Sequence, residues 1–186
     1  MMQRIKVYNA HCCGEIGDVI VESSVNLQGE TILEQSQYLF ENQKLRNFLL
    51  NEPRGGIFKH YNLIVPPKNK KALAGFIIME PEDNPPMSGS NSICVAKVLL
   101  EKNLITKQEP VTTFYLEAPG GLVKIEAECS HNKINDIKIE NLPSYVHKLE
   151  ETIEVEEFGS VTVSTVFGGD SFVICNASDF NLSIHP

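Results

Sequence analysis

A short polar turn at residues 88–92 holds the side chains best suited to chemistry in this sequence. Ser88, Ser90 and Asn91 carry short side chains whose oxygens can cap a helix. Gly89 lets a ligand or another backbone approach closely. The unpaired N–H groups at the start of a helix, together with the helix dipole, form a ready site for an anion such as a substrate carboxylate. An ordinary capped helix of the core is the alternative, and these residues by themselves favour it.

An apolar segment at residues 93–100 follows the turn, and Lys97 is its only charged residue. This composition predicts a helix that is buried on nearly all sides. The turn itself follows a proline-rich, acidic stretch at residues 80–86, which is typical of a loop. We therefore expect a central helix whose first turn is held at the end of a loop.

Five cysteines occur, an odd number with one adjacent pair and no CxxC spacing. This pattern disfavours both a disulfide framework and a structural zinc site. Cys94 and Cys175 lie in apolar runs, and we predict that both are buried and unreactive. Cys12 and Cys13 lie in a predicted loop, and the sequence assigns them neither a buried nor a reactive role.

The sequence indicates no metal or cofactor site. His11 and His60 have no further ligands at metal-binding spacing. A phosphate-binding loop, a dinucleotide-binding fingerprint and the nucleophile elbow of hydrolases are all absent from the sequence. Two glycine-containing stretches, residues 52–56 and 168–170, are most simply a helix stop and a tight turn.

The composition disfavours several classes of protein. The formal net charge is −8 and no basic run or stripe occurs, which disfavours nucleic-acid binding. No apolar run approaches the roughly 18 residues of a membrane span, and the first residues lack the apolar core of a signal peptide. We therefore expect a cytoplasmic protein without a membrane partner. With 42% hydrophobic residues in 186, the chain can build a core, and we predict a single domain over residues 1–186.

Hydrophobic periodicity predicts many short strands and two helices. The helices are expected at residues 31–50 and 88–100, and residues 11–18 are expected to form the broad loop of a hairpin. Strands are expected at residues 5–9, 19–22, 58–65, 73–79, 111–117, 121–129, 134–140, 152–156, 160–167 and 171–176. We therefore predict an α+β fold in which a curved mixed sheet wraps around the central helix.

Six motifs follow one another along the chain: HCCGE at 11–15, EPRG at 52–55, MSGSN at 87–91, APGGLV at 118–123, NLPS at 141–144 and FGGDSF at 167–172. Together they resemble the proline racemase family, which includes hydroxyproline epimerases and trans-3-hydroxy-L-proline dehydratases. The resemblance runs from about residue 5 to the last residue. Each motif alone is weak evidence, and it is the six in order that carry the assignment.

The resemblance implies a fold like that of diaminopimelate epimerase, with two similar halves that each roll a sheet around a central helix. It also implies a cofactor-free reaction on a small molecule, proline or hydroxyproline. Two residues, one from each half, flank the Cα atom of the substrate, and one removes a proton while the other delivers one. Ser88 is then the catalytic residue of this half. Gly89, Ser90 and Asn91 would bind the substrate, whose carboxylate rests on backbone N–H groups.

One departure from the family concerns the catalytic position. Members that racemise proline carry cysteine where this chain has Ser88; a thiol titrates near ~8.5, and a serine hydroxyl is a far poorer base. Serine at this position resembles the subgroup that dehydrates trans-3-hydroxy-L-proline, a reaction for which one base suffices. We expect a thiol of the other half to be that base, and Ser88 to position or protonate the substrate. Ser90 also replaces a histidine that is common in the cysteine-bearing members.

The other departure is length, because the chain is only about half as long as such an enzyme. The opposing catalytic residue is expected beyond residue 186, so we expect the isolated chain to be inactive. We expect its uncovered sheet edge and helix end to favour self-association. Two alternatives stay open: a 4-hydroxyproline epimerase or proline racemase-type isomerase, and a non-catalytic, degenerate relative that keeps the fold and binds a small carboxylate or its own kind.

Overall fold

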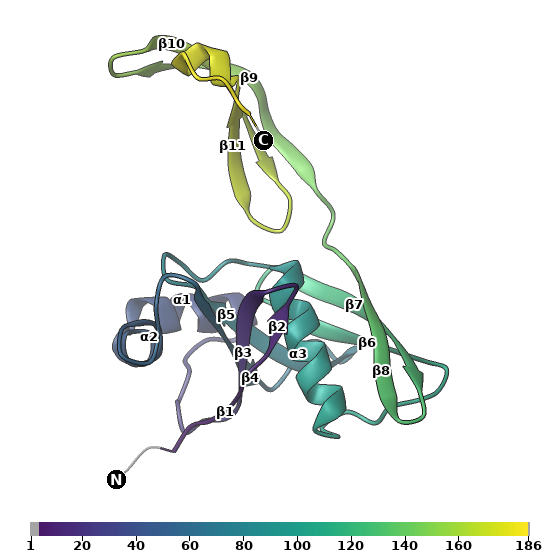
Figure 1. Cartoon of the computed structure of the whole chain (residues 1–186). Coiled ribbons are helices and arrows are strands. Elements are labelled where there is room, and N and C mark those ends of the chain that lie inside the picture. Colours follow the sequence, from purple (N-terminus) through teal and green to yellow (C-terminus); the bar gives the residue numbers. More distant parts are fainter. Residues whose placement is uncertain (1–3, 186) are drawn as a thin grey trace. The chain divides into compact units, whose positions relative to one another are not determined.

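The computed structural model describes residues 4–185, and Figure 1 shows the course of the chain. Two compact units divide it: unit 1 runs up to Leu142, and unit 2 begins at Pro143. Within the described residues, unit 1 contains three α-helices and an eight-stranded sheet, and unit 2 contains a three-stranded sheet.

Unit 1 begins with a strand and a tight hairpin. Its first strands are β1 (Lys6–Tyr8), β2 (His11–Cys12) and β3 (Glu15–Glu22). β2 and β3 pair across a two-residue turn, Cys13 and Gly14, whose φ angles are 50° and 99°. Two consecutive residues with positive φ give a hairpin turn whose twist suits the flanking strands. The prediction of a broad loop over residues 11–18 was therefore wrong, because the Cys-Gly turn closes the hairpin within two residues.

Two helices replace the single helix that was predicted at residues 31–50. They are α1 (Ile32–Glu41) and α2 (Lys44–Leu50). Thr31 begins α1 with a capping box, in which its hydroxyl accepts the Glu34 N–H and the Glu34 carboxylate accepts the Thr31 N–H. The break comes at Asn42, whose side-chain amide and backbone N–H both donate to the Tyr38 carbonyl. A short polar side chain that bonds the backbone in this way competes with continuation of the helix.

The sheet of unit 1 follows the order β1-β3-β4-β5-β6-β7-β8, with β2 paired to β3. Its later strands are β4 (Lys59–Val65), β5 (Ala72–Met79), β6 (Val111–Ala118), β7 (Gly121–Ser130) and β8 (Lys133–Glu140). The pairs β3–β4 and β5–β6 are parallel, and the other pairs are antiparallel. The predicted mixed sheet is therefore confirmed, and these later strands match their predicted bounds to within one residue.

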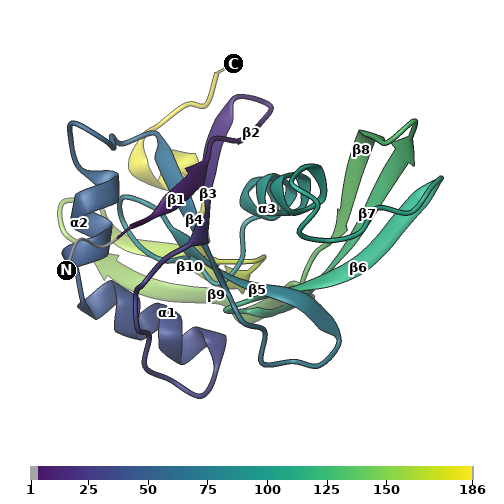
Figure 2. The same cartoon turned by 90° about the horizontal axis from the view of Figure 1, so that it is seen from below.

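Two hydrophobic cores lie on the two faces of this sheet. Figure 2 shows α3 (Gly89–Glu101) inside the curve of the sheet, with α1 and α2 on the other side. Successive side chains of β5 pack alternately in the two cores, because side chains along a strand point to opposite faces of the sheet. Phe76 and Ile78 pack in the core of α3, whereas Ile77 and Met79 pack in the core of α1 and α2.

The helix α3 is buried on nearly all sides, as its composition predicted. Most of its residues are buried, among them Val95, Leu99 and Leu100. The exposed charges, Lys97 and Glu101, lie one turn apart and approach within 3.8 Å. The predicted sheet wrapped around a central helix is thus confirmed for unit 1.

Unit 2 is an antiparallel sheet in the order β11-β10-β9. Its elements are β9 (Tyr145–Val155), β10 (Gly159–Phe167), β11 (Ser171–Cys175) and a 3-10 helix, η1 (Ala177–Phe180). The prediction placed only residues 152–156 in the first of these strands. Glu150 has a φ of 52°, and the pairing with β10 shifts register near it. This irregularity interrupts the period-two pattern, so only the part beyond it was recognised as a strand.

The turn at residues 168–170 is tight, as predicted. Gly169 has a φ of 103°, and the Gly168 N–H donates to the Asp170 carbonyl at 2.9 Å. Cys175, on the following edge strand, is exposed. The prediction that Cys175 is buried was therefore wrong, because every residue of β11 is exposed although the run is apolar.

Candidate functional site

The motif at residues 87–91 forms the start of α3, and several other motifs of unit 1 lie next to it. Ser88 is the N-cap residue, with an extended backbone, and its hydroxyl accepts the Asn91 N–H at 3.4 Å. The Ser88 carbonyl accepts both the Ser92 N–H at 3.0 Å and the Ser92 hydroxyl at 2.7 Å. Ser88, Gly89 and Ser90 are half-buried, so part of their surface is exposed to solvent. The predicted capped turn is therefore confirmed.

The loop before α3 is fixed by the turn between β6 and β7. The Gly120 N–H donates to the Pro86 carbonyl at 2.8 Å. A Cβ atom on Gly120 would lie 2.6 Å from Leu142 Cδ1 and 3.1 Å from the Pro86 oxygen. A side chain here would crowd the Pro86 carbonyl and displace Leu142, so the motif at residues 118–123 and Leu142 pack closely against the loop before α3.

The strand β3 approaches the first turn of α3 equally closely. A Cβ atom on Gly17 would lie 2.8 Å from Asn91 Oδ1, 3.0 Å from Cys94 Sγ and 3.2 Å from Asn62 Nδ2. Glycine at this position therefore lets two strands and the helix place three polar side chains together. The glycine carries no chemistry itself, and sequence reasoning missed it.

A buried amide network lies directly behind Ser88. Asn91 donates from Nδ2 to Ser88 Oγ at 3.0 Å and to Glu80 Oε1 at 3.2 Å, and its Nδ2 lies 3.2 Å from His60 Nδ1. Its Oδ1 accepts from Asn62 Nδ2 at 2.8 Å. Asn91 and Asn62 are 1% and 0% exposed. The Asn91 side chain is thus committed to neighbours within the protein.

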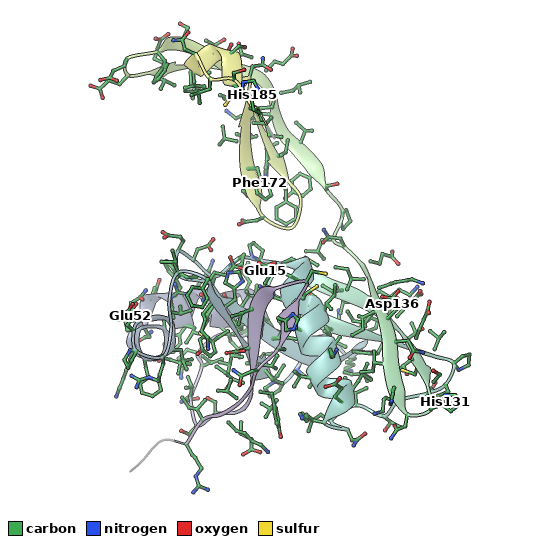
Figure 3. The ribbon with its side chains drawn as sticks, in the orientation of Figure 1. Glu15, Glu52, His131, Asp136, Phe172 and His185 are labelled. Atoms are coloured by element: carbon green, nitrogen blue, oxygen red, sulfur yellow. The ribbon has the colours of Figure 1, made fainter. Side chains whose placement is uncertain are left out.

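Two carboxylates approach the same histidine. His60 Nδ1 lies 3.5 Å from Glu15 and 3.5 Å from Glu80. Glu15 comes from the β2–β3 hairpin, and Figure 3 shows it beside the N-terminal end of α3. These three residues make the surroundings of Ser88 rich in hydrogen-bond acceptors.

Neither of the two cysteines nearest this network supplies a thiolate at neutral pH. Burial raises the pKa of Cys94 to about 12, with smaller contributions from Cys12 and Glu15. Burial also raises the pKa of Cys12, together with the neighbouring Cys13 and Glu15. Cys94 is buried, as predicted, and Cys12 is half-buried. A thiolate base for proton abstraction is therefore not provided by Cys12 or Cys94.

A second polar cluster lies further along β3. The Asp18 carboxylate, 1% exposed, accepts from Lys59 Nζ at 2.9 Å, Asn9 Nδ2 at 3.0 Å and the Ala10 N–H at 3.2 Å. The hydrogen bond from Lys59 to Asp18 raises the pKa of Lys59, although burial by itself would lower that pKa. Tyr61 joins this cluster to the motif at residues 52–55, because its hydroxyl lies 3.4 Å from Lys59 Nζ and donates to the Arg54 carbonyl at 3.3 Å. That motif therefore belongs to this cluster rather than to the turn at Ser88.

Arg46 positions the loop that carries Glu80. Its guanidinium, buried beneath the loop, donates to the carbonyls of Glu80 at 2.9 Å and Asp83 at 3.0 Å and to Asn84 Oδ1. Sequence reasoning missed both Arg46 and Glu80. The sequence did contain a signal for Arg46, which lies among the apolar residues of a short helix. A buried arginine needs hydrogen-bond acceptors, so such a position indicates that a loop or strand with free carbonyl groups packs against it.

Across residues 4–185, His, Cys, Asp and Glu side chains form no group of three or more that could hold a metal ion. None of the helices in that part of the chain combines the length and apolar character needed to cross a bilayer.

Comparison with known proteins identifies close structural relatives. A family profile described as proline racemase matches residues 7–186. A hydroxyproline epimerase from Agrobacterium vitis, solved with bound trans-4-hydroxy-L-proline, is 36% identical with a TM-score of 0.87, over 98% of this chain and 54% of that protein. A probable proline racemase from Agrobacterium radiobacter K84, with bound carbonate, is 34% identical with a TM-score of 0.88, over 97% of this chain and 54% of that protein.

A more distant likeness concerns the fold alone. A methylitaconate-delta-isomerase is 16% identical with a TM-score of 0.53, over 97% of this chain and 55% of that protein. Together these structures confirm the predicted α+β fold of the diaminopimelate epimerase type. The chain spans about half the length of each of these relatives.

Proposed function

The chain belongs to the proline racemase family, and we propose that it forms one half of a site that labilises the Cα proton of a hydroxyproline without a cofactor. Residues 1–186 then correspond to a single domain, the amino-terminal half of a two-domain enzyme. The observation that carries the proposal is the accessible first turn of α3, where a serine caps a buried helix.

The substrate carboxylate rests on the first turn of α3. The first N–H groups of a helix have no partner within the helix, and the dipole favours negative charge there. Gly89 and Ser90 offer these N–H groups at a half-buried position. Asn91 completes the turn with its own N–H and places its side chain behind Ser88.

Dehydration of trans-3-hydroxy-L-proline is the reaction that a serine at this position supports best. A base on the opposing half takes the Cα proton, the C3–O bond breaks, and the hydroxyl leaves as water once it is protonated. The enamine that forms then tautomerises to pyrroline-2-carboxylate. One base suffices, which suits a half-site in which Ser88 is a poor base and the nearby Cys12 and Cys94 are not ionised at neutral pH.

Epimerisation of 4-hydroxyproline is the second candidate. The observation in its favour is the 36% identity to a hydroxyproline epimerase with bound trans-4-hydroxy-L-proline. Epimerisation needs an acid and a base on opposite faces of Cα, so Ser88 would have to donate a proton in one direction and accept one in the other. The product distinguishes the two reactions, because only dehydration removes the ring hydroxyl.

A non-catalytic relative that only binds a carboxylate or associates with itself is the rival from a different class. It predicts ligand binding or dimer formation without any chemistry, even when a complementary half is present. A dimer mass in light scattering at high protein concentration would support self-association, whereas a monomer mass would contradict it.

The proposal is tested by NMR on the isotope-labelled chain with trans-3- and trans-4-hydroxy-L-proline. We expect millimolar ligand to shift the amide signals of Gly89, Ser90 and Asn91, while the Cα proton of each ligand persists in D₂O because the opposing base is missing. Unmoved amides would reject the carboxylate site. Loss of the Cα proton signal of a ligand would instead show that no second half is needed. The product that forms would then identify the reaction as dehydration or epimerisation. Full activity of Ser88→Ala in that case would remove Ser88 from the mechanism.

A further inference from the structure

We propose that Asn91 is a positioning residue that holds the Ser88 hydroxyl as a hydrogen-bond donor toward the substrate, and that Asn62 and Glu80 fix the Asn91 amide in the orientation this requires. The proposal rests on the proposed function for the identity of the substrate. It assigns roles to Asn62, Glu80 and the Asn91 side chain within the same site.

The orientation of the Asn91 amide follows from the chemistry of its neighbours. Glu80 Oε1 lies 3.2 Å from Asn91 Nδ2, and an ionised carboxylate can only accept a hydrogen bond. The nitrogen of Asn91 must therefore face Glu80 and Ser88. On the other side, Asn62 Nδ2 donates to Asn91 Oδ1 at 2.8 Å. Reversal of the Asn91 amide would place its oxygen against Glu80 Oε1 and its nitrogen against Asn62 Nδ2, and would leave buried polar groups unpaired.

This orientation determines what the Ser88 hydroxyl can do. A serine hydroxyl has two acceptor positions and one proton to donate. Asn91 occupies both acceptor positions, with Nδ2 at 3.0 Å and its backbone N–H at 3.4 Å. The remaining capacity of Ser88 is its proton, which in the free protein can be shared with Ser90 Oγ at 3.2 Å. A substrate oxygen that takes the place of Ser90 Oγ would receive a hydrogen bond from Ser88.

The arrangement disfavours Ser88 as a base, because its lone pairs are engaged. It supports a site with a single base, located elsewhere, and a neutral donor at Ser88. His60 Nδ1 is a competing acceptor for the second proton of the Asn91 amide at 3.2 Å. Glu15 and Glu80 both lie 3.5 Å from that ring nitrogen, so the histidine has partners of its own.

A double-mutant cycle on ligand affinity tests the proposal, with trans-3-hydroxy-L-proline as the probe. Each of Ser88→Ala and Asn91→Ala should raise the dissociation constant about tenfold, the value of one good hydrogen bond. Because Asn91 acts through Ser88, the double variant should bind as weakly as either single variant rather than about a hundredfold more weakly than the parent. Additive losses, or an unchanged affinity in either single variant, would overturn the proposal.

Asn62→Leu provides the second variant. Asn62 is fully buried and donates to the Asn91 side chain, so we expect it to act on the ligand through Asn91. We expect Asn62→Leu to weaken binding in the parent and to change nothing in the Ser88→Ala background. Asn135→Leu is the matched control, because Asn135 is exposed and donates instead to Ser130 at 2.8 Å.

A ligand-free measurement separates failure of this proposal from failure of the proposed function. The side-chain NH₂ signals of Asn91 should exchange with water far more slowly than those of Asn135, and Asn62→Leu should accelerate that exchange. If the parent binds no hydroxyproline but the Asn91 signals are protected, the proposed function fails and the network stands. If the Asn91 signals exchange as fast as those of Asn135, the network is overturned whatever the ligand does.

Discussion

Unit 1 and unit 2 both contain antiparallel hairpins, but they differ in how they bury their apolar side chains. Unit 1 has two cores, one around α3 and one beneath α1 and α2. In the described part of unit 2, Val161 and Val163 are the only buried apolar side chains, and residues such as Phe172 and Ile174 are exposed. A three-stranded sheet with so little buried area gains little stability from its own packing.

The difference shows why the capped turn can serve as a site. A side chain holds a productive orientation when the residues behind it are packed and hydrogen-bonded. Ser88 meets this requirement, because Asn91 and Asn62 behind it are buried. The glycine turn at residues 168–170 lacks this kind of support, because none of the polar side chains in the described part of unit 2 is buried.

The largest expected difference in stability between the two units comes from replacing one phenylalanine in each. Phe76 is 0% exposed and Phe172 is 51% exposed. Phe76→Ala should cost about 3–5 kcal/mol of unfolding free energy, because it opens a cavity in the core, and Phe172→Ala should cost less than about 0.5 kcal/mol. Urea unfolding followed by circular dichroism measures both. Equal losses would show that unit 2 packs as tightly as unit 1.

A smaller effect is expected at the ion pair between Asp18 and Lys59. Asp18 raises the pKa of Lys59, so the folded state holds the ammonium proton more tightly than the unfolded chain does. The stabilisation is complete below the unfolded pKa of about 10.4 and is lost as the pH rises through the higher folded value. Lys59→Met should cost about 2–3 kcal/mol at pH 7 and should reduce the alkaline loss of stability.

The control for that variant is Lys6→Met. Lys6 pairs with Glu22 at 3.1 Å, but both side chains are about half exposed or more, at 49% and 67%. Solvent screens such a pair, so this control should change stability little. Urea midpoints at pH 7 and at several values between about 9 and 11 provide the comparison. If the two methionine variants unfold at the same urea concentration, the Asp18 cluster is not a special feature of unit 1.

The smallest expected effect concerns two cysteines that the sequence did not distinguish. Cys94→Ser should cost about 1–2 kcal/mol, because it buries a hydroxyl in the closely packed core of α3, whereas Cys175→Ser should cost less than about 0.5 kcal/mol. Alkylation of the native protein at pH 8 should label Cys175 and spare Cys94, whose pKa is raised to about 12. Labelling of Cys94 at a similar rate would show that the core around α3 opens readily.

The order of the elements was largely predictable from the sequence. The apolar run after residue 92 indicated a buried helix because a single charge interrupts it, and β4 to β8 of the sheet were indicated by period-two patterns. The break at Asn42 and the tight turn at Cys13 were missed. The break depends on a hydrogen bond from the Asn42 side chain to the Tyr38 carbonyl, and the turn depends on a positive φ at Cys13. Residue type alone indicates either feature only weakly.

The candidate site was predictable in part. Capping by Ser88 follows from residue type and position, because a serine oxygen placed before an apolar run satisfies N–H groups that the helix leaves open. Glu80, Asn62 and Gly17 were not predictable, since they come from a loop and two strands that are distant in the sequence.

The sequence by itself therefore determined the α+β fold, the family and the capped turn, because periodicity, motif order and capping are local properties of the chain. Only the tertiary structure decided which polar groups stand behind Ser88, and which of Cys94 and Cys175 is buried. The physical reason is that burial and hydrogen-bond partners depend on which elements pack together. Gly17 illustrates this, because its missing side chain matters only where β3 meets α3.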